Sequence, residues 1–140
     1  MKVVIDTNIF ISTVLKPEST PAQVVKIIKQ GKITLLISHD ILSEFKRVLL
    51  YPAIVKRHGL NQKQISQALK EISQGAIFTP GVIKVNAVKK DPTDNKFIAC
   101  ALEGQADFII SGDHHLTDLK TYQKIKIVNP FDFLEIYSQQ

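Results

Sequence analysis

The sequence contains a single cysteine, Cys100, and no apolar run long enough to cross a membrane. One cysteine excludes an internal disulfide, and its place in the apolar stretch FIACAL favours a buried structural thiol. A membrane span needs about 18 apolar residues, and Asp6 interrupts the apolar start of the chain, where a signal peptide would have its core. We therefore expect a soluble, cytoplasmic protein with no membrane association.

The sequence also lacks internal repeats, low-complexity tracts, a cysteine cluster and a regularly spaced histidine pair. These absences exclude repeat architectures and argue against a structural zinc site. With 140 residues, 44% hydrophobic residues and a mean hydropathy of +0.04, the chain suits one globular domain with one core.

The chain is basic, with 18 Lys and Arg residues against 13 Asp and Glu, a net charge of +5 and a pI of about 9.3. A basic chain permits a polyanionic partner such as nucleic acid. The lysines are scattered along the chain, as on an ordinary solvated surface, so the charge alone does not identify the partner.

Short apolar runs alternate along the chain with longer segments whose apolar residues have helical spacing. The runs that predict strands are KVVI (2–5), ITLLIS (33–38), GVIKV (81–85), DFIIS (107–111) and KIKIV (124–128). The segments that predict helices are residues 20–31, 39–50, 61–75, 92–103 and 130–137. Strands separated by helices are typical of βαβ units, so we expect an α/β fold with a mostly parallel sheet covered on both faces.

Local signals place several of the helix ends. Ser38 and Asn61 are expected to cap the helices that follow them, because short polar side chains accept hydrogen bonds from the first turn. Gly31 and Gly75 are expected to end helices, and Pro52 to stop the helix that begins after Ser38.

The stretch KKDPTDNK, residues 89–96, opens the helix predicted over 92–103. Asp91 can cap this helix, whose first residue would be Pro92, and Asp94 then lies in the first turn near the positive end of the helix dipole. A ligand role explains two carboxylates and an amide equally well. This stretch alone leaves both interpretations open.

Three further acids stand where a parallel sheet would bring them together. Asp6 directly follows the first predicted strand, Asp113 follows the strand DFIIS after one glycine, and Glu44 lies at the border of the apolar face of its helix. Each has a simple structural alternative, which is a helix cap for Asp6, a Gly-Asp turn for Asp113 and an ion pair with Arg47 for Glu44.

Together with Asp94, these acids form a set of four that the predicted fold gathers near the carboxyl ends of the strands. Clustered carboxylates raise one another's pKa and repel, so divalent cations are the obvious remedy. Oxygen ligands favour Mg²⁺ or Mn²⁺, and such a site suits phosphoryl chemistry. The polar residues that could orient the acids or bound water are Thr7, Asn8, Asn95 and Ser111.

Four stretches, VVIDTNIFIS, SHDILSEF, DPTDNKFIACAL and ADFIISGDHHL, resemble the acidic motifs of PIN-domain ribonucleases. The resemblance spans nearly the whole chain and is closest to the single-domain VapC-like proteins, which include the toxins of toxin-antitoxin pairs. It implies one PIN domain over residues 1–140, with a three-layer α/β/α architecture and a mostly parallel central sheet of four to five strands.

The resemblance also implies an activity, the metal-dependent hydrolysis of single-stranded RNA that leaves a 5′ phosphate and a 3′ hydroxyl. It implies two kinds of protein partner, a second copy of the chain in a homodimer and a small antitoxin whose C-terminal segment covers the site. The acidic quartet that would bind Mg²⁺ or Mn²⁺ is Asp6, Glu44, Asp94 and Asp113. The supporting residues would be Thr7, Asn8, Asp91, Asn95 and Ser111, and the lysines that could meet the RNA backbone are Lys89, Lys90 and Lys96.

The last motif departs from the pattern of many relatives, because His114 and His115 follow Asp113 where those relatives place another acid or an aromatic residue. The histidines could contact phosphate or donate a proton, and adjacent side chains on a turn are also often simply exposed. Their roles stay open, as does that of Asp118.

Two other functions remain as alternatives. The segments DTN and GDHHLTD also resemble haloacid dehalogenase-like phosphatases, but those enzymes usually have an acid two residues after the nucleophile, where Asn8 stands here. The second alternative is a catalytically silent PIN-like module that binds RNA or a protein, because one fold can host several functions. The intact acidic quartet argues against it.

Overall fold

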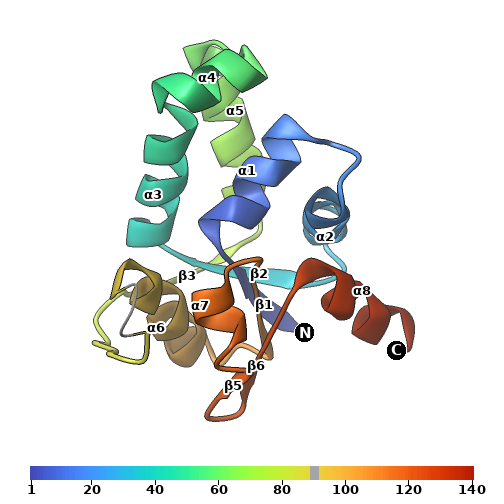
Figure 1. Ribbon diagram of the computed structural model, residues 1–140, viewed down its shortest axis with the longest axis vertical. Helices are drawn as coiled ribbons and strands as arrows, with labels where there is room; N and C mark the ends of the chain where they lie inside the picture. The colour runs from blue at the N-terminus through green and yellow to red at the C-terminus, as the bar shows by residue number, and fades with distance from the viewer. Residues whose placement is uncertain (89–91) are drawn as a thin grey trace.

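The computed structural model describes residues 1–88 and 92–140, and its centre is a six-stranded sheet in the order β3-β2-β1-β4-β6-β5 (Figure 1). The strands are β1 (Lys2–Ile5), β2 (Thr34–Ser38), β3 (Ile77–Thr79), β4 (Phe108–Ile110), β5 (Thr121–Tyr122) and β6 (Ile125–Val128). Strands β3, β2, β1, β4 and β6 run parallel to one another, and β5 pairs with β6 antiparallel. The predicted mostly parallel sheet is therefore confirmed.

Helices cover both faces of this sheet, as expected for a three-layer α/β architecture (Figure 1). The helices between β1 and β3 are α1 (Thr7–Leu15), α2 (Thr20–Lys29), α3 (His39–Leu49), α4 (Pro52–His58) and α5 (Gln62–Ser73). The later helices are the 3₁₀ turn η1 (Pro92–Asp94), α6 (Asn95–Gly104), α7 (His114–Thr117) and α8 (Pro130–Ser138). Helix α6 packs across β1, β2, β3 and β4, while α1 to α5 lie on the other side of the sheet.

Two expectations about the strands need correction. The sheet has six strands rather than four to five, because the two-residue strand β5 forms a hairpin with β6. The run GVIKV (81–85) is not a strand; the strand β3 ends at Thr79, before Pro80, and pairs with β2. Residues 81–88 instead form an irregular segment that precedes α6 in sequence and is held by hydrogen bonds to the α6 side chains Asn95 and Glu103.

The predicted helix caps are confirmed at two helices. Ser38 Oγ accepts a hydrogen bond from the backbone N–H of Ile41 at 3.3 Å and so caps α3. Asn61 caps α5 through a reciprocal pair, in which Asn61 Oδ1 accepts from Gln64 N at 2.8 Å and Gln64 Oε1 accepts from Asn61 N at 3.0 Å. Pro52, expected only to stop a helix, is also the first residue of α4.

The core contains stacked aromatic side chains that join separate elements. Phe10 of α1 stacks on Phe45 of α3 with ring centroids 4.7 Å apart, and Phe108 of β4 meets Phe133 of α8 edge to face at 5.5 Å. Cys100 is buried in α6, and this burial raises the pKa of its thiol to about 11, which confirms the prediction of a structural cysteine.

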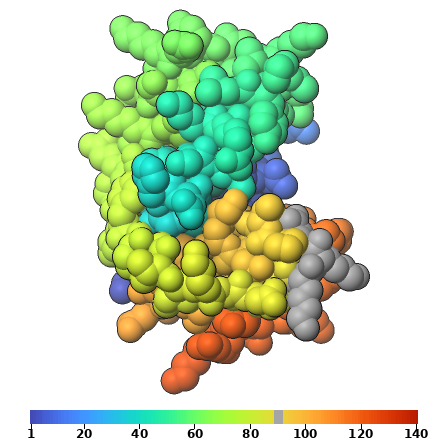
Figure 2. All heavy atoms as spheres, turned by 90° about the vertical axis from the view of Figure 1, so that its left-hand side faces the viewer, coloured from blue at the N-terminus to red at the C-terminus, as the bar shows by residue number. Residues whose placement is uncertain are grey.

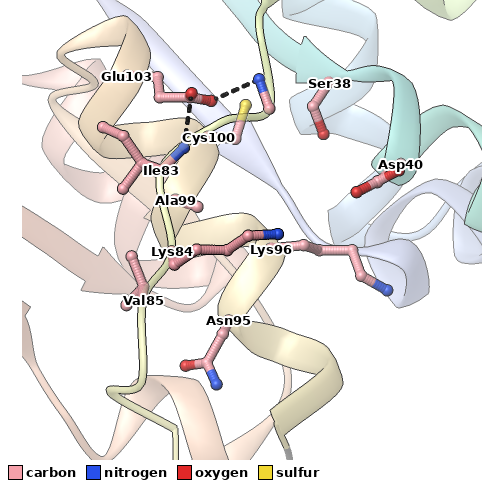
Figure 3. A pocket seen from close by; sticks show the side chains of 11 residues that line it. Ser38, Asp40, Ile83, Lys84, Val85, Asn95, Lys96, Ala99, Cys100 and Glu103 are labelled. Carbon is pink, nitrogen blue, oxygen red and sulfur yellow. Dashed lines mark hydrogen bonds between the residues drawn. The ribbon is translucent and has the colours of Figure 1, made fainter.

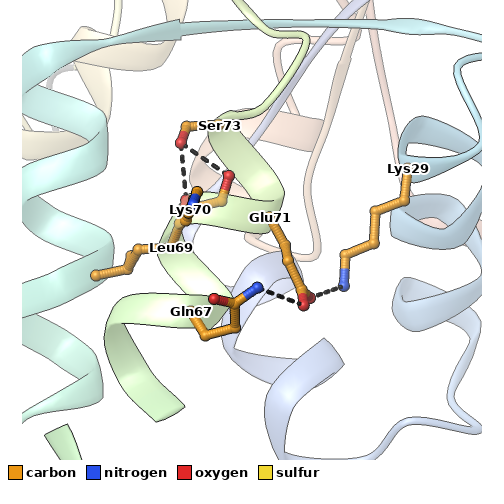
Figure 4. A network of polar contacts seen from close by, with 6 residues as sticks. All are labelled: Lys29, Gln67, Leu69, Lys70, Glu71 and Ser73. Carbon is orange, nitrogen blue, oxygen red and sulfur yellow. Dashed lines mark hydrogen bonds and ion pairs between the residues drawn. The ribbon is translucent and has the colours of Figure 1, made fainter. Parts of the chain in front are cut away.

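A polar network on the surface links α2 to α5 (Figure 4). Lys29 Nζ lies 3.4 Å from Glu71 Oε2, and Gln67 Nε2 donates to Glu71 Oε1 at 3.3 Å. These groups are exposed, so their contribution to stability is about 1 kcal/mol or less. No helix in the described part of the chain is long and apolar enough to span a membrane.

Helix α6 packs tightly against β2 at its last residue, Gly104. A Cβ at this position would lie 2.5 Å from Cδ1 of Leu36, which is itself 1% exposed and cannot move into solvent. The glycine is therefore required by the distance between α6 and β2.

We expect Gly104→Ala to lower the free energy of unfolding by about 1 to 3 kcal/mol, because the added methyl overpacks the core. Urea unfolding followed by circular dichroism measures this change. Gly112→Ala is the matched control, since a Cβ at Gly112 meets no atom within 4 Å. Equal stability of the two variants would show that α6 can shift away from β2 at little cost.

Candidate active site

The acidic site begins where β1 and β4 end side by side. The backbone N–H of Asp6, the residue after β1, donates to the carbonyl of Ile110, the last residue of β4, at 3.1 Å. Ser111 follows Ile110, and its hydroxyl donates to Asp6 Oδ2. Strand pairing thus fixes both residues at the carboxyl edge of the sheet, where parallel α/β proteins bind their ligands.

Asp6 serves both interpretations that the sequence left open. Its Oδ1 accepts from the backbone N–H of Ile9 at 3.0 Å and caps α1, while its Oδ2 is held by Ser111. The side chain is 3% exposed, and this burial, together with the charge of the nearby Asp113, raises the pKa of Asp6 to about 6 against the lowering effect of its hydrogen bonds. Ionised Asp6 is therefore costly in the metal-free protein.

Ser111 connects Asp6 to the third acidic motif. Its Oγ accepts from the backbone N–H of Asp113 at 2.9 Å while the same hydroxyl donates to Asp6. Asp113 Oδ1 in turn accepts from the backbone N–H of His115 at 2.9 Å and so caps the short helix α7. The hydroxyl of Ser111 is fully buried and holds the two acidic loops in one arrangement.

Asp94, Asp113 and His115 form a compact group. One ligand atom from each of the three lies within 4.8 Å of the others, and Asp94 shares a hydrogen bond with Asp113. The His115 ring nitrogen Nδ1 is 3.7 Å from Asp113 Oδ1. Two carboxylates can share a hydrogen bond only if one of them carries a proton, so a cation bound here would take the place of that proton.

Electrostatics around Asp113 differ from those around Asp6. Partial burial opposes ionisation of Asp113, but the hydrogen bonds from Asp94 and from the His115 backbone, with the two neighbouring histidine rings, outweigh it. These groups hold the pKa of the Asp113 carboxyl below its usual range. An ionised carboxylate beside a second acid and an imidazole is a donor set that suits a divalent cation.

Asp94 is available to this group because it does not cap α6 with its side chain. It is the residue before Asn95, the first residue of α6, and it makes no capping hydrogen bond there. Asp91, which was expected to cap the helix, and Lys89 and Lys90 lie outside the described residues. The ligand interpretation of Asp94 is thus compatible with the local structure.

Glu44 lies in a separate set of contacts. Its Oε2 accepts from the hydroxyl of Thr7, and its Oε1 pairs with Lys96 Nζ and lies 3.5 Å from Arg47. Its side chain is 14% exposed. The ion pair with Arg47 that the sequence offered as an alternative is present, but Lys96 and Thr7 hold Glu44 as well.

Glu44 still adjoins the other acids through its partners, since Thr7 directly follows Asp6 and Lys96 lies two residues after Asp94. The pairing also changes the picture of Lys96, which was expected to face the RNA backbone. In the structure its ammonium is bound to Glu44.

The hydrogen bonds of Asn95 run to the segment before α6. Its Oδ1 accepts from the backbone N–H of Ala87 at 3.0 Å and of Val88 at 2.7 Å. Asn95 and Lys96 leave α6 in different directions (Figure 3). Successive residues of a helix point about 100° apart, so a neighbour of Asp94 in sequence need not share its face.

Asn95 and Glu103, both on α6, anchor the segment 81–88. Glu103 accepts from the backbone N–H groups of Gly81, Val82 and Ile83 at 2.9, 2.7 and 3.1 Å (Figure 3). The segment lies beside α6 and the start of α3 on the face shown in Figure 2. These anchors supply the backbone hydrogen bonds that a strand would otherwise need, which explains why residues 81–85 are not a strand.

Three other candidate residues are not part of the group of Asp94, Asp113 and His115. The side chains of Asn8, His114 and Asp118 are exposed, the charge of His114 still acts on Asp113, and Asp118 follows Thr117 as the C-cap of α7. The structure adds His115 to the acidic group, a residue whose role the sequence left open. The signal for it was its position two residues after Asp113, because an Asp that accepts from the N–H of residue i+2 forms a tight turn that brings the two side chains together.

Comparison with known proteins agrees with this geometry. The PIN domain family matches residues 2–115, so this chain belongs to the PIN domain family. The uncharacterized protein MJ1680 of Methanocaldococcus jannaschii is 33% identical over 147 residues, which cover 99% of this chain and 93% of that protein.

Among solved structures, VapBC2 from Rickettsia felis, bound to a DNA fragment from their promoter, contains a chain with a similar fold. The TM-score is 0.57 at 14% sequence identity, and the match covers 92% of this chain and 98% of that chain. With PIN membership established, the two short motifs that resemble haloacid dehalogenase-like phosphatases have no further support.

We expect Asp6→Asn to stabilise the metal-free protein at pH 7.5 by about 1 to 3 kcal/mol, since a pKa shift of one unit corresponds to about 1.4 kcal/mol. The folded pKa of about 6 lies above the ordinary value of 3.8, so the penalty is absent below pH 4 and grows as the pH rises through 6. Asparagine also retains the cap of α1.

Urea unfolding in the presence of a chelator at pH 4 and at pH 7.5 measures this effect. The matched control is Asp118→Asn, which removes an exposed acid. If Asp6→Asn gave no gain at pH 7.5, or the same gain at both pH values, Asp6 would not be the strained carboxylate of this site.

Proposed function

We propose that this protein is an endoribonuclease that hydrolyses phosphodiester bonds of single-stranded RNA and depends on Mg²⁺ or Mn²⁺. The observation that carries the proposal is the group of Asp94, Asp113 and His115 at the carboxyl edge of a PIN-domain sheet, next to the buried Asp6. Net positive charge suits a polyanionic substrate.

The donor set fits a hard divalent cation. Asp94, Asp113 and His115 would hold the ion, with Asp6 and Glu44 completing the acidic site, because carboxylate oxygens are preferred by Mg²⁺ and Mn²⁺. When bound, such an ion lowers the pKa of water and stabilises negative charge on phosphoryl oxygens. Ser111 and Thr7 orient their acids by hydrogen bonds, which is the usual task of residues behind a metal site.

The proposed reaction adds the oxygen of one water molecule to phosphorus and breaks the bond between phosphorus and the ribose O3′. One fragment then ends in a 5′ phosphate, and a proton passes to O3′ to give a 3′ hydroxyl on the other. The carboxylates beside the phosphorus can accept the proton that water loses.

We further propose that the whole chain, residues 1–140, forms a single PIN domain and is the toxin of a toxin-antitoxin pair. Strand β6 lies beyond residue 115, where the family match ends, yet it pairs with β4 in the same sheet, which supports one domain. The fold shared with a chain of VapBC2 supports an antitoxin as partner. We propose a homodimer as well, as the resemblance to VapC-like proteins implies. The RNA-binding roles of Lys89, Lys90 and Lys96 belong to this proposal too.

We expect the purified protein to cut labelled single-stranded RNA in Mn²⁺ or Mg²⁺ and to stop when a chelator is added. Asp94→Asn and Asp113→Asn should each lower the rate by about 100-fold or more, because even residues behind a metal ligand cost 10- to 100-fold when changed. Purification of all proteins in parallel controls for contaminating ribonuclease.

Equal cleavage by wild type and both variants would reject the nuclease proposal. If the wild type bound RNA without cutting it, the silent-module alternative would be favoured.

We expect His115→Ala to weaken Mn²⁺ binding about 10- to 100-fold in isothermal titration calorimetry, since it removes one of three donors. His114→Ala is the matched control, because His114 is an exposed neighbour that is not part of the group. If the two variants bound Mn²⁺ equally well, His115 would not belong to the metal site.

A further inference from the structure

We propose that a hollow beside the acidic site binds one unpaired nucleobase of the RNA, stacked on the ring of Phe131. The hollow has a volume of about 290 Å³, which is at the lower end of the range for small-molecule sites. The proposal rests on the proposed ribonuclease function, and it names a part of the chain that would read the substrate.

The position of the hollow connects it to the acids. Its walls include Asn8, two residues after Asp6, and Gly112, the residue directly before Asp113. Its other walls come from the starts of α2 and α8, which include Pro21 and Phe131. A base held here therefore belongs to a nucleotide close to the phosphate that lies at the carboxylates.

The chemistry of the hollow suits the flat face and polar edge of a base. Most of its surface is apolar, and Asn8 and Asn129 add amide groups at its border. Phe131 is 63% exposed, more than any other aromatic side chain among residues 1–88 and 92–140. A phenyl ring in solvent contributes little to folding, whereas single-stranded RNA is commonly bound by stacking bases on such rings.

A second hollow, of about 240 Å³, continues from the first along α1 and shares Asn8 and Ser12 with it. It is lined by Lys16 and Arg57, whose cations suit the phosphates of a nucleic acid. An aromatic ring, cationic side chains and carboxylates therefore lie along one surface. This combination suits a single RNA strand better than it suits an apolar protein segment.

Phe131 lies beyond residues 2–115, which the PIN domain family matches. Phe131 is thus not part of the shared acidic motifs, whereas Asn8 and Gly112 of the same hollow are. It would distinguish the substrate preference of this chain from that of PIN proteins with another residue at the start of the last helix.

A base-removal scan tests the stacking site. The substrate is a single-stranded RNA that the wild type cleaves, and a set of copies carries an abasic nucleotide at each position in turn. The value of kcat/KM is measured for wild type, Phe131→Ala and Phe131→Trp. Phe78→Ala is the matched control, because Phe78 is also exposed, at 49%, but lies on β3 at the far edge of the sheet.

With the wild type, removal of the base at one position near the cleaved bond should lower kcat/KM about 5- to 150-fold, the range for stacking of one base. Phe131→Ala should lower kcat/KM for intact RNA by a similar factor and lose nothing more when that base is removed. Phe131→Trp should retain the sensitivity, and Phe78→Ala should behave as wild type.

Wild-type kcat/KM in Phe131→Ala, with RNA cleavage itself intact, would overturn the stacking site and leave the nuclease proposal standing. If no protein cleaves RNA, fluorescence anisotropy of the same RNAs in chelator decides separately. Binding that weakens in Phe131→Ala alone would then support the stacking site without the nuclease, and binding that is absent or unchanged in this variant would overturn it.

Discussion

The pairing of β1 with β4 is the constraint on which the rest of the site depends. It ends with the hydrogen bond from Asp6 N–H to Ile110 and delivers Asp6 and Ser111 side by side at the edge of the sheet. Because Ser111 holds Asp6 and also accepts from the backbone of Asp113, the register of two strands determines the spacing of the acids. The sheet therefore also determines how strongly the carboxylates repel one another in the folded state.

The acids differ in how their surroundings offset this repulsion. Asp6 is buried and has a raised pKa, Asp113 has a lowered pKa beside donors, and Glu44 is neutralised by Lys96 and Arg47. The four carboxylates are therefore not equivalent as metal ligands. A cation would relieve most strain at Asp6, Asp94 and Asp113, because burial and the charge of Asp113 oppose ionisation of Asp6, and Asp94 lies close to Asp113.

Much of the fold follows from features that act locally. Buried strands such as KVVI and ITLLIS and caps such as Ser38 and Asn61 were predictable because a few neighbouring residues determine them. Helix α1 was not recognised beyond its cap at Asp6, and α4 was hidden behind the stop signal of Pro52. Strand β3 was misplaced because residues 77–79 are few and half exposed, whereas residues 81–85 have the stronger pattern.

The site was predictable as a set of acids but not as a set of contacts. Periodicity places Asp6 and Asp113 after strands, yet it says nothing of which cation reaches Glu44 or which way a turn aims His115. Asn95 illustrates the limit, because an amide beside Asp94 suggests a shared task, and only the helix geometry shows that it holds Ala87 and Val88. The contacts of Glu44 with Lys96 and of Asn95 with Ala87 join separate elements, and local patterns carry no record of them.

The two anchors of segment 81–88 on α6 have a consequence for changes of chain length. Glu103 holds residues 81–83 and Asn95 holds residues 87–88, and both side chains project from one rigid helix, so the distance that the segment must cover is fixed. Between the anchors, Lys84 and Asn86 are exposed and can change identity, whereas Val85 packs against the core. An inserted residue must bulge outward or enter the hollow of about 170 Å³ that Lys84 lines, so this stretch resists insertion more than substitution.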